Sequence, residues 1–281
     1  MPARTDSIIK KLKEQEKAEG KLPTLLEFYK KLLEIQNSVG KKIAVSNPVF
    51  TREQVQAHAI ARKPLVGSTE LAIDWSLLRQ SYREVTALFN QYPEIFGTLP
   101  QEFLNLTPGR VINKRTVRAW YRGQPIVTPI PLTDDHLKAL LATIFAAAVK
   151  PFLYKEAVAL SHLLDMEIWR RGYCPICGGN PDFSYLAKDT SARWLVCARC
   201  DTEWLFQRLQ CPYCENSDQN KLSFFTNDDG TYRLYICDRC KHYLKAVDLR
   251  YFKDEVLILL ERLTTMDMDR QAQANGYSPC A

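Results

Sequence analysis

Eight of the nine cysteines in this chain form four Cys-x-x-Cys pairs, and they are the residues best suited to do chemistry. The pairs are Cys174/Cys177, Cys197/Cys200, Cys211/Cys214 and Cys237/Cys240, and Cys280 is left over near the end. A Cys-x-x-Cys at a tight turn places two sulfurs on the same side of the chain, which is half of a tetrahedral four-sulfur site. The N-terminal segment has no apolar stretch typical of a signal peptide, so we expect a reducing compartment and metal ligation instead of disulfides.

The spacing of the pairs favours two sites formed in sequential order. Cys177 and Cys197 are separated by 19 residues, and Cys214 and Cys237 by 22, which suits a hairpin that folds one pair against the next. The ten residues between Cys200 and Cys211 could also close, so the alternative pairing stays open. We predict one metal ion, iron or zinc, bound by four Cys thiolates at each site; ligand type alone does not separate the two metals.

Catalysis is not indicated by any pattern in the chain. Four-thiolate sites lack the open coordination position that a hydrolytic zinc centre needs. The sequence has no GxSxG, Walker, dinucleotide-binding or HExxH motif, and its four histidines, His58, His136, His162 and His242, are scattered. A thioredoxin-like dithiol would be expected beside a βαβ pattern, which is missing here. We therefore predict no enzyme activity, and we interpret Cys280 as an incidental thiol.

The predicted elements that position the cysteines form one pattern that occurs twice in the sequence. Each half contains a Cys pair, a hairpin of two short β runs, a second Cys pair and a third β run. In the second half, Asn227 to Gly230 forms a strong hairpin-turn signal. The predicted strands are 183–185, 194–196 and 204–206 in the first half, and 222–225, 232–236 and 243–247 in the second. We expect tandem rubredoxin-like or zinc-ribbon modules over 171–207 and 208–252.

The first 170 residues contain no cysteine and need a core of their own. Apolar residues at helical spacing predict a helix around 25–35, one from Asp74 to Asn90, one starting at Thr133 and one following Pro151. The proline-rich segment 91–132 is expected to hold short helices at most. The fold class is therefore α+β: an all-α domain over 1–170, two metal ribbons, and a short C-terminal helix with a frayed tail over 253–281.

Charge argues against nucleic acid as the partner of the ribbons. The chain has a net charge of +6, but residues 171–250 hold 11 Lys and Arg against 10 Asp and Glu, and loaded four-thiolate sites add negative charge. The excess lies in the helical domain, where Arg110, Lys114, Arg115, Arg118 and Arg122 surround Trp120 and Tyr121. This segment is either a solvated basic loop or a docking surface for an acidic partner. We find no apolar run of about 18 residues, so we predict no membrane insertion.

The amino-acid sequence around the cysteines is specific enough to suggest a protein family. The runs from Cys174 to Pro181, from Leu195 to Trp204, from Arg208 to Cys214 and from Cys237 to Lys245 resemble FdhE, the accessory proteins of formate dehydrogenase. The resemblance covers the ribbon region closely and the helical domain only in length and character. Asp201, Thr202, Glu203 and Trp204 also fall in the family's signature. Turn structure for the first three and ribbon core for Trp204 are nevertheless the better explanation of these residues.

The resemblance implies a cytoplasmic maturation factor with rubredoxin-type metal bound by the eight paired cysteines. It implies that the protein docks on the catalytic subunit of a respiratory formate dehydrogenase and is needed for that enzyme to become active; a homodimer is left open. Two further hypotheses remain. The ribbons could hold redox-active iron, or dithiols that reduce the immature enzyme. A weaker alternative is a nucleic-acid-binding zinc ribbon.

Overall fold

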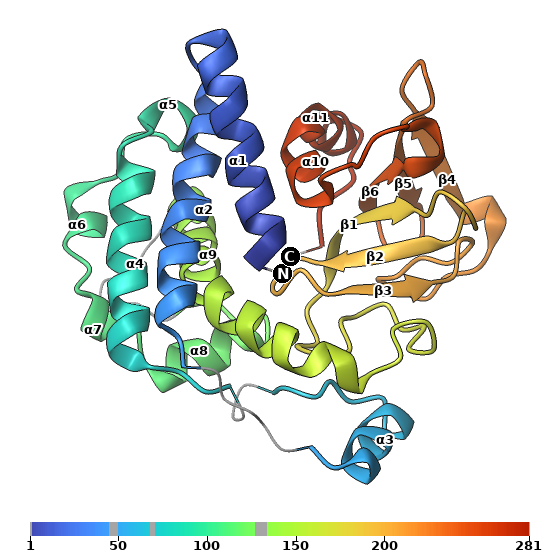
Figure 1. The fold of residues 1–281 in the computed structure, drawn as a ribbon, viewed down its shortest axis with the longest axis horizontal. Coiled ribbons are helices and arrows are strands. Elements are labelled where there is room, and N and C mark those ends of the chain that lie inside the picture. Colours follow the sequence, from blue (N-terminus) through green and yellow to red (C-terminus); the bar gives the residue numbers. More distant parts are fainter. Residues whose placement is uncertain (1, 45–49, 68–70, 127–133, 281) are drawn as a thin grey trace. The chain divides into compact units, whose positions relative to one another are not determined.

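The computed structural model describes residues 2–44, 50–67, 71–126 and 134–280, and their contacts group them into two compact units (Figure 1). The helical unit comprises Met1–Asn47 and Val66–Glu156. The cysteine-rich unit comprises Pro48–Leu65 and Ala157–Ala281. The division falls inside a long helix, and the cysteine-rich unit also takes in a helical segment from much earlier in the chain. Helices therefore precede a cysteine-bearing sheet, as the sequence predicts.

The described part of the helical unit is built from four long helices and four short ones. Asp74 caps one of the long helices by accepting a 3.0 Å hydrogen bond from Leu77 N, so the predicted start is confirmed. The proline-rich segment holds only short helices where it is described, also as predicted, while residues 127–133, including Thr133, lie outside the described residues. The elements are α1 (Pro2–Glu19), α2 (Thr24–Lys42), α4 (Trp75–Asn90), α5 (Pro93–Phe96), α6 (Gln101–Leu104), α7 (Pro108–Val111), α8 (Lys114–Tyr121) and α9 (Asp135–Leu160).

Helix α9 corrects the prediction of two separate helices around Pro151. A proline inside a helix has no N–H to donate to the carbonyl four residues earlier, which here belongs to Ala147. The side chain of Gln36, from α2, donates to that oxygen instead, at 2.9 Å. Ser81 Oγ, from α4, donates to the next carbonyl, Ala148 O, at 3.0 Å. The break that Pro151 should cause is therefore compensated by two neighbouring helices.

Residues Asp135–Leu163 are long and apolar enough to cross a membrane when judged by length and composition alone. The expectation that no segment reaches that length is therefore wrong. Half of the window is nevertheless buried within the protein, and Ile144, Phe145 and Val149 are fully buried. Because a core helix passes the same test, this helix is explained by its packing in the helical unit.

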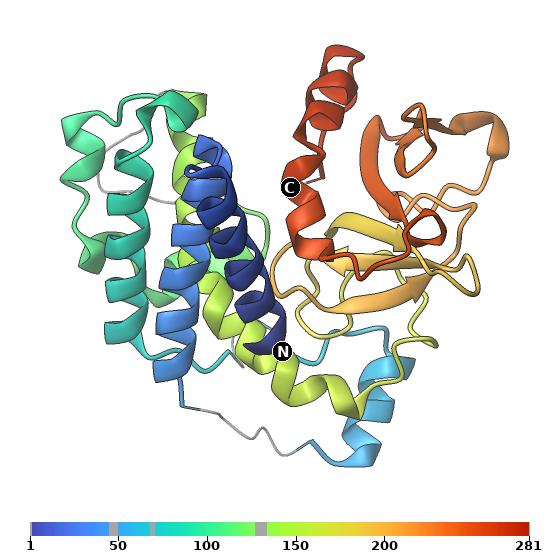
Figure 2. The same cartoon turned by 45° about the horizontal axis from the view of Figure 1, so that its top comes forward.

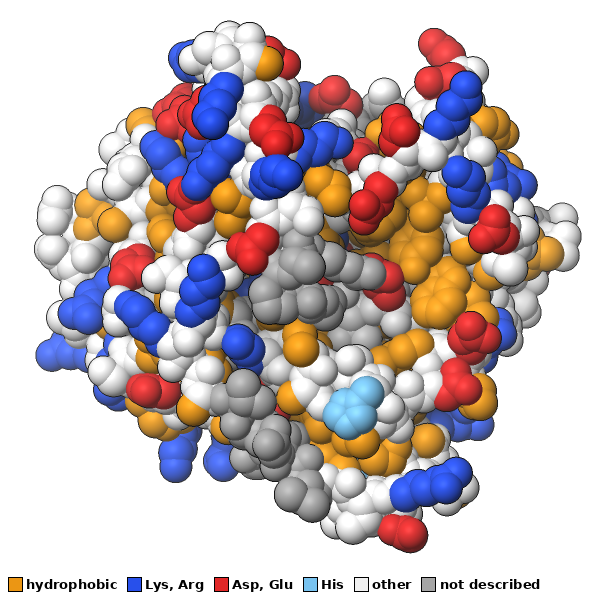
Figure 3. All heavy atoms as spheres, viewed as in Figure 1, with side chains coloured by type: hydrophobic (Ala, Val, Ile, Leu, Met, Phe, Trp, Pro, Cys, Tyr) orange, Lys and Arg blue, Asp and Glu red, His pale blue; other side chains and the backbone are white. Residues whose placement is uncertain are grey.

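The basic segment spans α7 and α8. Its cationic side chains are exposed, whereas its aromatic side chains pack into the helical unit. The cations of this segment, Arg110, Lys114, Arg115, Arg118 and Arg122, are all exposed. Trp120 instead packs on Phe145, with ring centroids 5.6 Å apart, and Tyr121 OH donates to Val66 O at 2.6 Å. The aromatic residues thus anchor α8 in the helical unit. Elsewhere on the face of the helical unit shown in Figure 3, Lys and Arg side chains alternate with Asp and Glu.

The two predicted ribbons join into a single six-stranded sheet. Its order is β3-β2-β1-β6-β5-β4, so each ribbon is an antiparallel three-stranded piece and β1 pairs with β6 in parallel. Ser184 Oγ, on β1, donates to Lys245 O, on β6, at 3.0 Å in the buried centre of the sheet. The strands are β1 (Pro181–Leu186), β2 (Arg193–Cys197), β3 (Glu203–Phe206), β4 (Leu222–Thr226), β5 (Tyr232–Cys237) and β6 (His242–Asp248).

A segment that precedes most of the helical unit in sequence belongs to the cysteine-rich unit. It carries α3 (Arg52–Ile60), which begins with a capping box formed by Thr51 and Gln54. After α3, Leu65 N donates to Pro175 O at 3.0 Å, and Tyr173 OH donates to Arg62 O at 2.8 Å. These bonds tie the segment to the first Cys-x-x-Cys pair. Short 3-10 turns at Ser161–Leu163, Gln219–Lys221 and Leu249–Tyr251 complete the unit.

The C-terminal tail forms two helices instead of one, α10 (Ile258–Thr264) and α11 (Met266–Ala274), which lie along one face of the sheet (Figure 2). Ala272 is buried against Leu234, Ile236 and Tyr243, so the tail beyond residue 269 is ordered by packing. Lys245 is 5% exposed and pairs with Asp269 of α11, and its ammonium also donates to Arg262 O at 2.9 Å. The helices are thus held by a buried ion pair as well as by apolar contact.

Asp269→Ala should destabilise the cysteine-rich unit by about 3 kcal/mol, because it leaves the buried Lys245 ammonium without its carboxylate. The double variant Lys245→Met, Asp269→Ala should recover much of that loss, since the uncompensated charge is gone. Denaturant unfolding measures both. The matched control is Asp267→Ala, which removes an exposed ion pair with Arg270 on the same helix and should cause no measurable loss. Equal losses for Asp267→Ala and Asp269→Ala would contradict this account.

Candidate metal centres

Each Cys-x-x-Cys pair forms the same backbone turn. The amide four residues after the first cysteine donates back to its carbonyl, at 2.9 Å from Gly178 N to Cys174 O and at 2.8 Å from Lys241 N to Cys237 O. In three of the pairs the first cysteine's own amide also donates to the carbonyl five residues later, at 2.9 Å. The turn therefore presents both sulfurs to one side of the chain. Such a turn is specified locally, which is why spacing alone predicts it.

The residue after the second cysteine adopts a left-handed backbone conformation in all four turns. Gly178 does so at φ 68°, where glycine is favoured, but Asp201, Glu215 and Lys241 do so at 56–57°. A Cβ on the next residue, Gly179, would lie 3.1 Å from Cys197 Sγ, so this glycine allows the first two turns to approach closely. The repeated conformation shows that the turn imposes the backbone angle on non-glycine residues.

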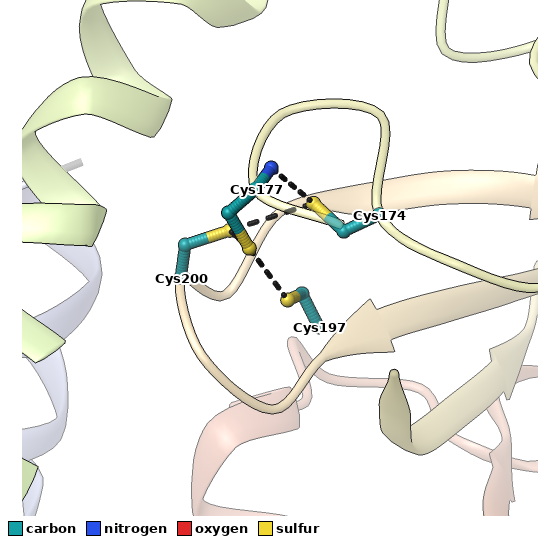
Figure 4. Close-up of side chains that lie close together, drawn as sticks. All are labelled: Cys174, Cys177, Cys197 and Cys200. Carbon is teal, nitrogen blue, oxygen red and sulfur yellow. Dashed lines mark hydrogen bonds between the residues drawn. The ribbon is translucent and has the colours of Figure 1, made fainter. Parts of the chain in front are cut away.

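The first cluster brings together Cys174, Cys177, Cys197 and Cys200, all fully buried (Figure 4). Two of them come from the loop before β1; Cys197 ends β2 and Cys200 follows in the next turn. The Sγ atoms of Cys177 and Cys200 are 3.4 Å apart, and the pairs Cys174–Cys200 and Cys177–Cys197 are each 3.5 Å apart. The four sulfurs face a common centre.

The second cluster brings together Cys211, Cys214, Cys237 and Cys240. The Sγ atoms of Cys211 and Cys240 are 3.7 Å apart, as are those of Cys214 and Cys237. Cys211 and Cys237 are buried, whereas Cys214 and Cys240 are partly exposed. The structure thus groups the cysteines in the sequential order that the spacing favours, and the alternative pairing across 201–210 is not formed.

Both clusters fit a four-coordinate metal. Four sulfurs at a metal–sulfur distance of about 2.3 Å in a tetrahedron lie about 3.8 Å apart, close to the separations seen here. Backbone amides point at the sulfurs as well: Cys177 N donates to Cys174 Sγ at 3.5 Å and Arg199 N to Cys197 Sγ at 3.4 Å. Asn216 Nδ2 lies 3.9 Å from Cys237 Sγ in the second cluster. Donors of this kind stabilise metal-bound thiolates. Zinc and iron both suit this set of ligands.

Neighbouring sulfurs shift the thiol pKa values of the first cluster in opposite directions. Hydrogen bonds with Cys174 and Cys197 raise the pKa of Cys177 well above its ordinary value. Burial raises the pKa of Cys200 well above its ordinary value too. Burial opposes ionisation of Cys197, but hydrogen bonds with the other three sulfurs outweigh it and hold its pKa well below the usual range. Ionisation of Cys197 is thus favoured over that of Cys177 and Cys200.

The thiol pKa values of the second cluster are also shifted in opposite directions. Burial raises the pKa of Cys240 to about 11 and also raises that of Cys211. The pKa of Cys237 is lowered, because hydrogen bonds from the backbone of Cys240 and Arg239 outweigh burial. Metal uptake requires deprotonated sulfurs, so it displaces the protons held by the raised thiols and is favoured as pH rises.

Arg262, from α10, holds the backbone around the first cluster, and the sequence alone gives no sign of this role. Its guanidinium donates to Asp201 Oδ1 at 2.6 Å and to Cys197 O at 2.9 Å, and it pairs with Asp182 at 2.8 Å. Asp201 follows Cys200 directly and is 3% exposed. The arginine thus fixes the second turn of the cluster from a helix about sixty residues away. Only a contact between distant parts of the chain could have shown this.

The other residues singled out in the sequence have structural contacts. Trp204 is fully buried and its Nε1 donates to Arg171 O at 2.7 Å, so it is a core residue. Thr202 Oγ1 lies 3.0 Å from Cys200 Sγ, and Glu203 accepts from Tyr185 OH at 2.9 Å. Cys280 is outside both clusters and accepts a 3.3 Å hydrogen bond from Asn180. Ring nitrogens of His58, His136 and His242 lie within hydrogen-bond distance of backbone carbonyls.

The arrangement defines a class of protein: a helical unit followed by a sheet that carries two closed four-cysteine centres. Comparison with known proteins then shows which proteins of this class the chain is similar to. The sequence profile described as "FdhE, central domain" matches residues 173–208, which contain the first cluster. A "Protein FdhE homolog" from Aquifex aeolicus is 26% identical over 290 residues, covering 95% of this chain and 93% of that protein.

Two further likenesses agree with this match. "Protein FdhE" of Escherichia coli (strain K12 / DH10B) is 33% identical over 114 residues, which are 39% of this chain and 36% of that protein. The crystal structure of the FdhE protein from Pseudomonas aeruginosa has the same fold, with a TM-score of 0.62 and 23% identity over 99% of this chain and 93% of that one. Over nearly its whole length the chain is therefore similar to an FdhE homolog, and it shares the fold of an FdhE protein.

Cys174→Ser should remove one of two metal equivalents per chain, because three thiolates of the first cluster cannot close a tetrahedral site. Cys214→Ser should remove the other equivalent. Elemental analysis of protein purified without oxygen measures both. Cys280→Ser is the matched control and should retain the full content, since its sulfur belongs to neither cluster. A full complement of metal in Cys174→Ser would contradict the assignment.

A chelator should strip the loaded protein in two phases, with the second cluster losing its metal first. Cys214 and Cys240 are partly exposed, whereas the four sulfurs of the first cluster are buried. Release can be followed by the colour of the metal–chelator complex. The Cys214→Ser variant should show only the slow phase. A single phase in the wild-type protein, or loss of the slow phase in that variant, would contradict this order.

Proposed function

We propose that the protein is an accessory factor for the maturation of formate dehydrogenase, and that it docks on the catalytic subunit of that enzyme in the cytoplasm. Similarity to FdhE proteins over most of the chain is the observation that carries the proposal. In this role the protein is not itself an enzyme. Its two metal centres hold a rigid surface that recognises the client, and the client supplies the catalytic chemistry.

The structure of the metal centres supports a holding role. All four sulfurs of the first cluster are buried, and a metal held by four thiolates has no open position for a substrate or water. The clusters hold the ends of hairpins that run into one continuous sheet. A metal bound there stabilises the folded sheet, because a preformed four-sulfur site does not exist in the unfolded chain.

A redox role is the second candidate, and the exposure of the second cluster favours it. Cys214 and Cys240 are partly exposed, so iron at that cluster would lie close enough to the surface to exchange electrons with a client. Metal content and the visible spectrum of protein purified without oxygen from its own host separate the two candidates. Thiolate-to-iron bands, with activity lost on zinc replacement, would favour redox. Full function with zinc alone would exclude it.

The docking proposal predicts that the protein binds the catalytic subunit from its own host, and binds the immature form about tenfold or more tighter than the mature enzyme. A maturation factor must have such a difference in affinity, because only differential binding drives its release. Biolayer interferometry with the catalytic subunit, purified before and after cofactor insertion, measures both affinities. Equal affinity for the two forms would contradict a role in maturation.

The metal dependence of docking needs a matched pair of variants. The double variant Cys174→Ser, Cys177→Ser removes half the ligands of the first cluster and should abolish binding, because the ends of β1 and β2 lose their anchor. Cys280→Ser should bind like the wild-type protein. Retained binding by the double variant would show that the metal ribbons are not needed for docking.

A further inference from the structure

The cysteine-rich unit contains a cavity of about 210 Å³ whose wall includes two cysteines of the second cluster, Cys211 and Cys237. It lies between β4, β5, β6 and the loop 208–213, beside the second cluster. Its wall is mainly apolar, with Leu209, Tyr213, Phe224 and Leu244 among the lining residues. Leu209 and Phe224 are 63% and 51% exposed, so the apolar surface continues from the cavity onto the outside of the protein. Exposed apolar surface around a pocket is typical of a binding site.

The register of the strands places three lining residues of the cavity, Phe224, Tyr235 and Leu244, on the face of the second ribbon opposite the residues that pack against α11. Phe224 pairs with Tyr235 and Tyr235 with Leu244, and side chains directly opposite in a sheet share a face. The other face holds Leu234 and Tyr243, which pack against α11. Phe225 pairs with Leu234 and so belongs to the same face as Leu234, although its own side chain is exposed. The two neighbouring phenylalanines of β4 therefore serve different faces.

Arg193 lines the cavity and has no carboxylate partner among the described residues. It is 2% exposed, with its guanidinium over the rings of Phe206 and Tyr235 at 5.3 and 5.2 Å. Its Nη2 donates to two backbone carbonyls of the loop that follows β3, while its Nε is buried without a hydrogen-bond partner. Burial lowers the pKa of Arg193 to about 10, so the side chain is still cationic at neutral pH.

Apart from the cluster ligands Cys211 and Cys237, the charged side chains that line the cavity are both cationic. Arg193 and Arg208 line it, and no Asp or Glu is among its lining residues. Arg208 is exposed, whereas Arg233, which lies over the Phe224 ring at 4.9 Å, is paired with Asp248 at 2.9 Å. A buried cation with an unpaired donor favours a ligand that brings an acceptor or a negative charge. The complementary ligand is therefore apolar with an acidic group close by.

Strand β4 adds a backbone feature to this surface. It forms one edge of the six-stranded sheet and is hydrogen-bonded to β5 alone, so one side of its backbone lies outside the ladder. Its sequence, Leu-Ser-Phe-Phe-Thr, has no charge and no proline, and four of its five residues are exposed. Edge strands of this kind are templates for an added strand, and natural proteins protect them unless they are used.

We propose that this surface binds an extended peptide segment of a partner protein. The peptide pairs with the free edge of β4, places one large apolar side chain in the cavity, and sets an acidic residue against Arg208, where the buried Arg193 cation also attracts it. The cavity is too small for a typical ligand pocket of about 300–1,000 Å³, and its size suits a single side chain. The inference does not depend on the identity of the client, because it concerns the type of peptide recognised.

A library of random twelve-residue peptides displayed on phage tests the inference with the full-length, metal-loaded protein. The library is first depleted on the Phe224→Lys variant and then selected on the wild-type protein. Enriched peptides should share a large apolar residue with an acidic residue at an alternate position, since alternate side chains of a strand share a face. No enrichment, or enrichment of basic sequences, would overturn the proposal.

Matched variants then locate the binding of a synthetic peptide with the enriched sequence. Phe224→Lys and Arg208→Glu should each weaken binding about tenfold or more, since an anchor in a pocket dominates such interfaces. Phe225→Lys alters a phenylalanine on the other face that is 60% exposed, against 51% for Phe224, and should leave the affinity unchanged. All variants must keep the wild-type metal content. Equal effects of the Phe224 and Phe225 substitutions would overturn the placement in the cavity.

Two more measurements test the strand pairing with β4 and the contribution of Arg193 separately. A peptide methylated on alternate backbone nitrogens should lose binding, because it can no longer complete the ladder. Unchanged binding would overturn the pairing with β4. Arg193→Met should weaken binding of the acidic peptide more than that of its Gln-substituted form. If Arg193→Met releases the second metal and leaves peptide affinity unchanged, the arginine serves the metal centre, and its part in the proposal is overturned.

Discussion

The approach of four sulfur atoms to one another is the constraint on which the cysteine-rich unit depends. Sulfurs 3.4–3.7 Å apart, with some ionised, repel one another unless a cation lies between them. The rest of the unit is arranged to bring them there. Hairpins return the chain, so that the turn before β1 meets the turn after β2, and left-handed residues close each turn. Folding of this unit and metal binding by its cysteines therefore depend on each other.

Fusion of the two ribbons into one sheet links the two centres. The parallel pairing of β1 with β6 makes the end of one ribbon the neighbour of the other, and Gly172 brings the chain before the first cluster against Pro212 of the second, where a Cβ would meet Pro212 O at 1.8 Å. Tyr213 reinforces the join, since its hydroxyl donates to Pro181 O and Tyr243 O at 3.1 and 3.2 Å. The two centres are thus joined through packed backbone.

Local features could be predicted from the sequence, and features made by distant residues could not. The four turns, the hairpins and the sequential clusters follow from short spacings around each cysteine. The continuous α9 depends on Gln36, which is 111 residues from the carbonyl that it satisfies. The clamp by Arg262 on Cys197 O spans 65 residues. The parallel pair of β1 and β6 is likewise non-local, so periodicity indicated two ribbons and could not show that they share a sheet.

The two copies of the ribbon have diverged in a way that assigns them different tasks. The first has four buried sulfurs, a clamp by Arg262 and a fully buried tryptophan, Trp204, on its third strand. In the second ribbon two cysteines are partly exposed, and β4 forms an edge of the sheet. This ribbon also adjoins a cavity lined by Arg193, whose Nε has no hydrogen-bond partner. Burial and ion pairing stabilise a structure, whereas exposed edges and unpaired donors cost stability unless something binds them. The first ribbon therefore serves as the anchor of the sheet, and the second presents the surface that meets a partner.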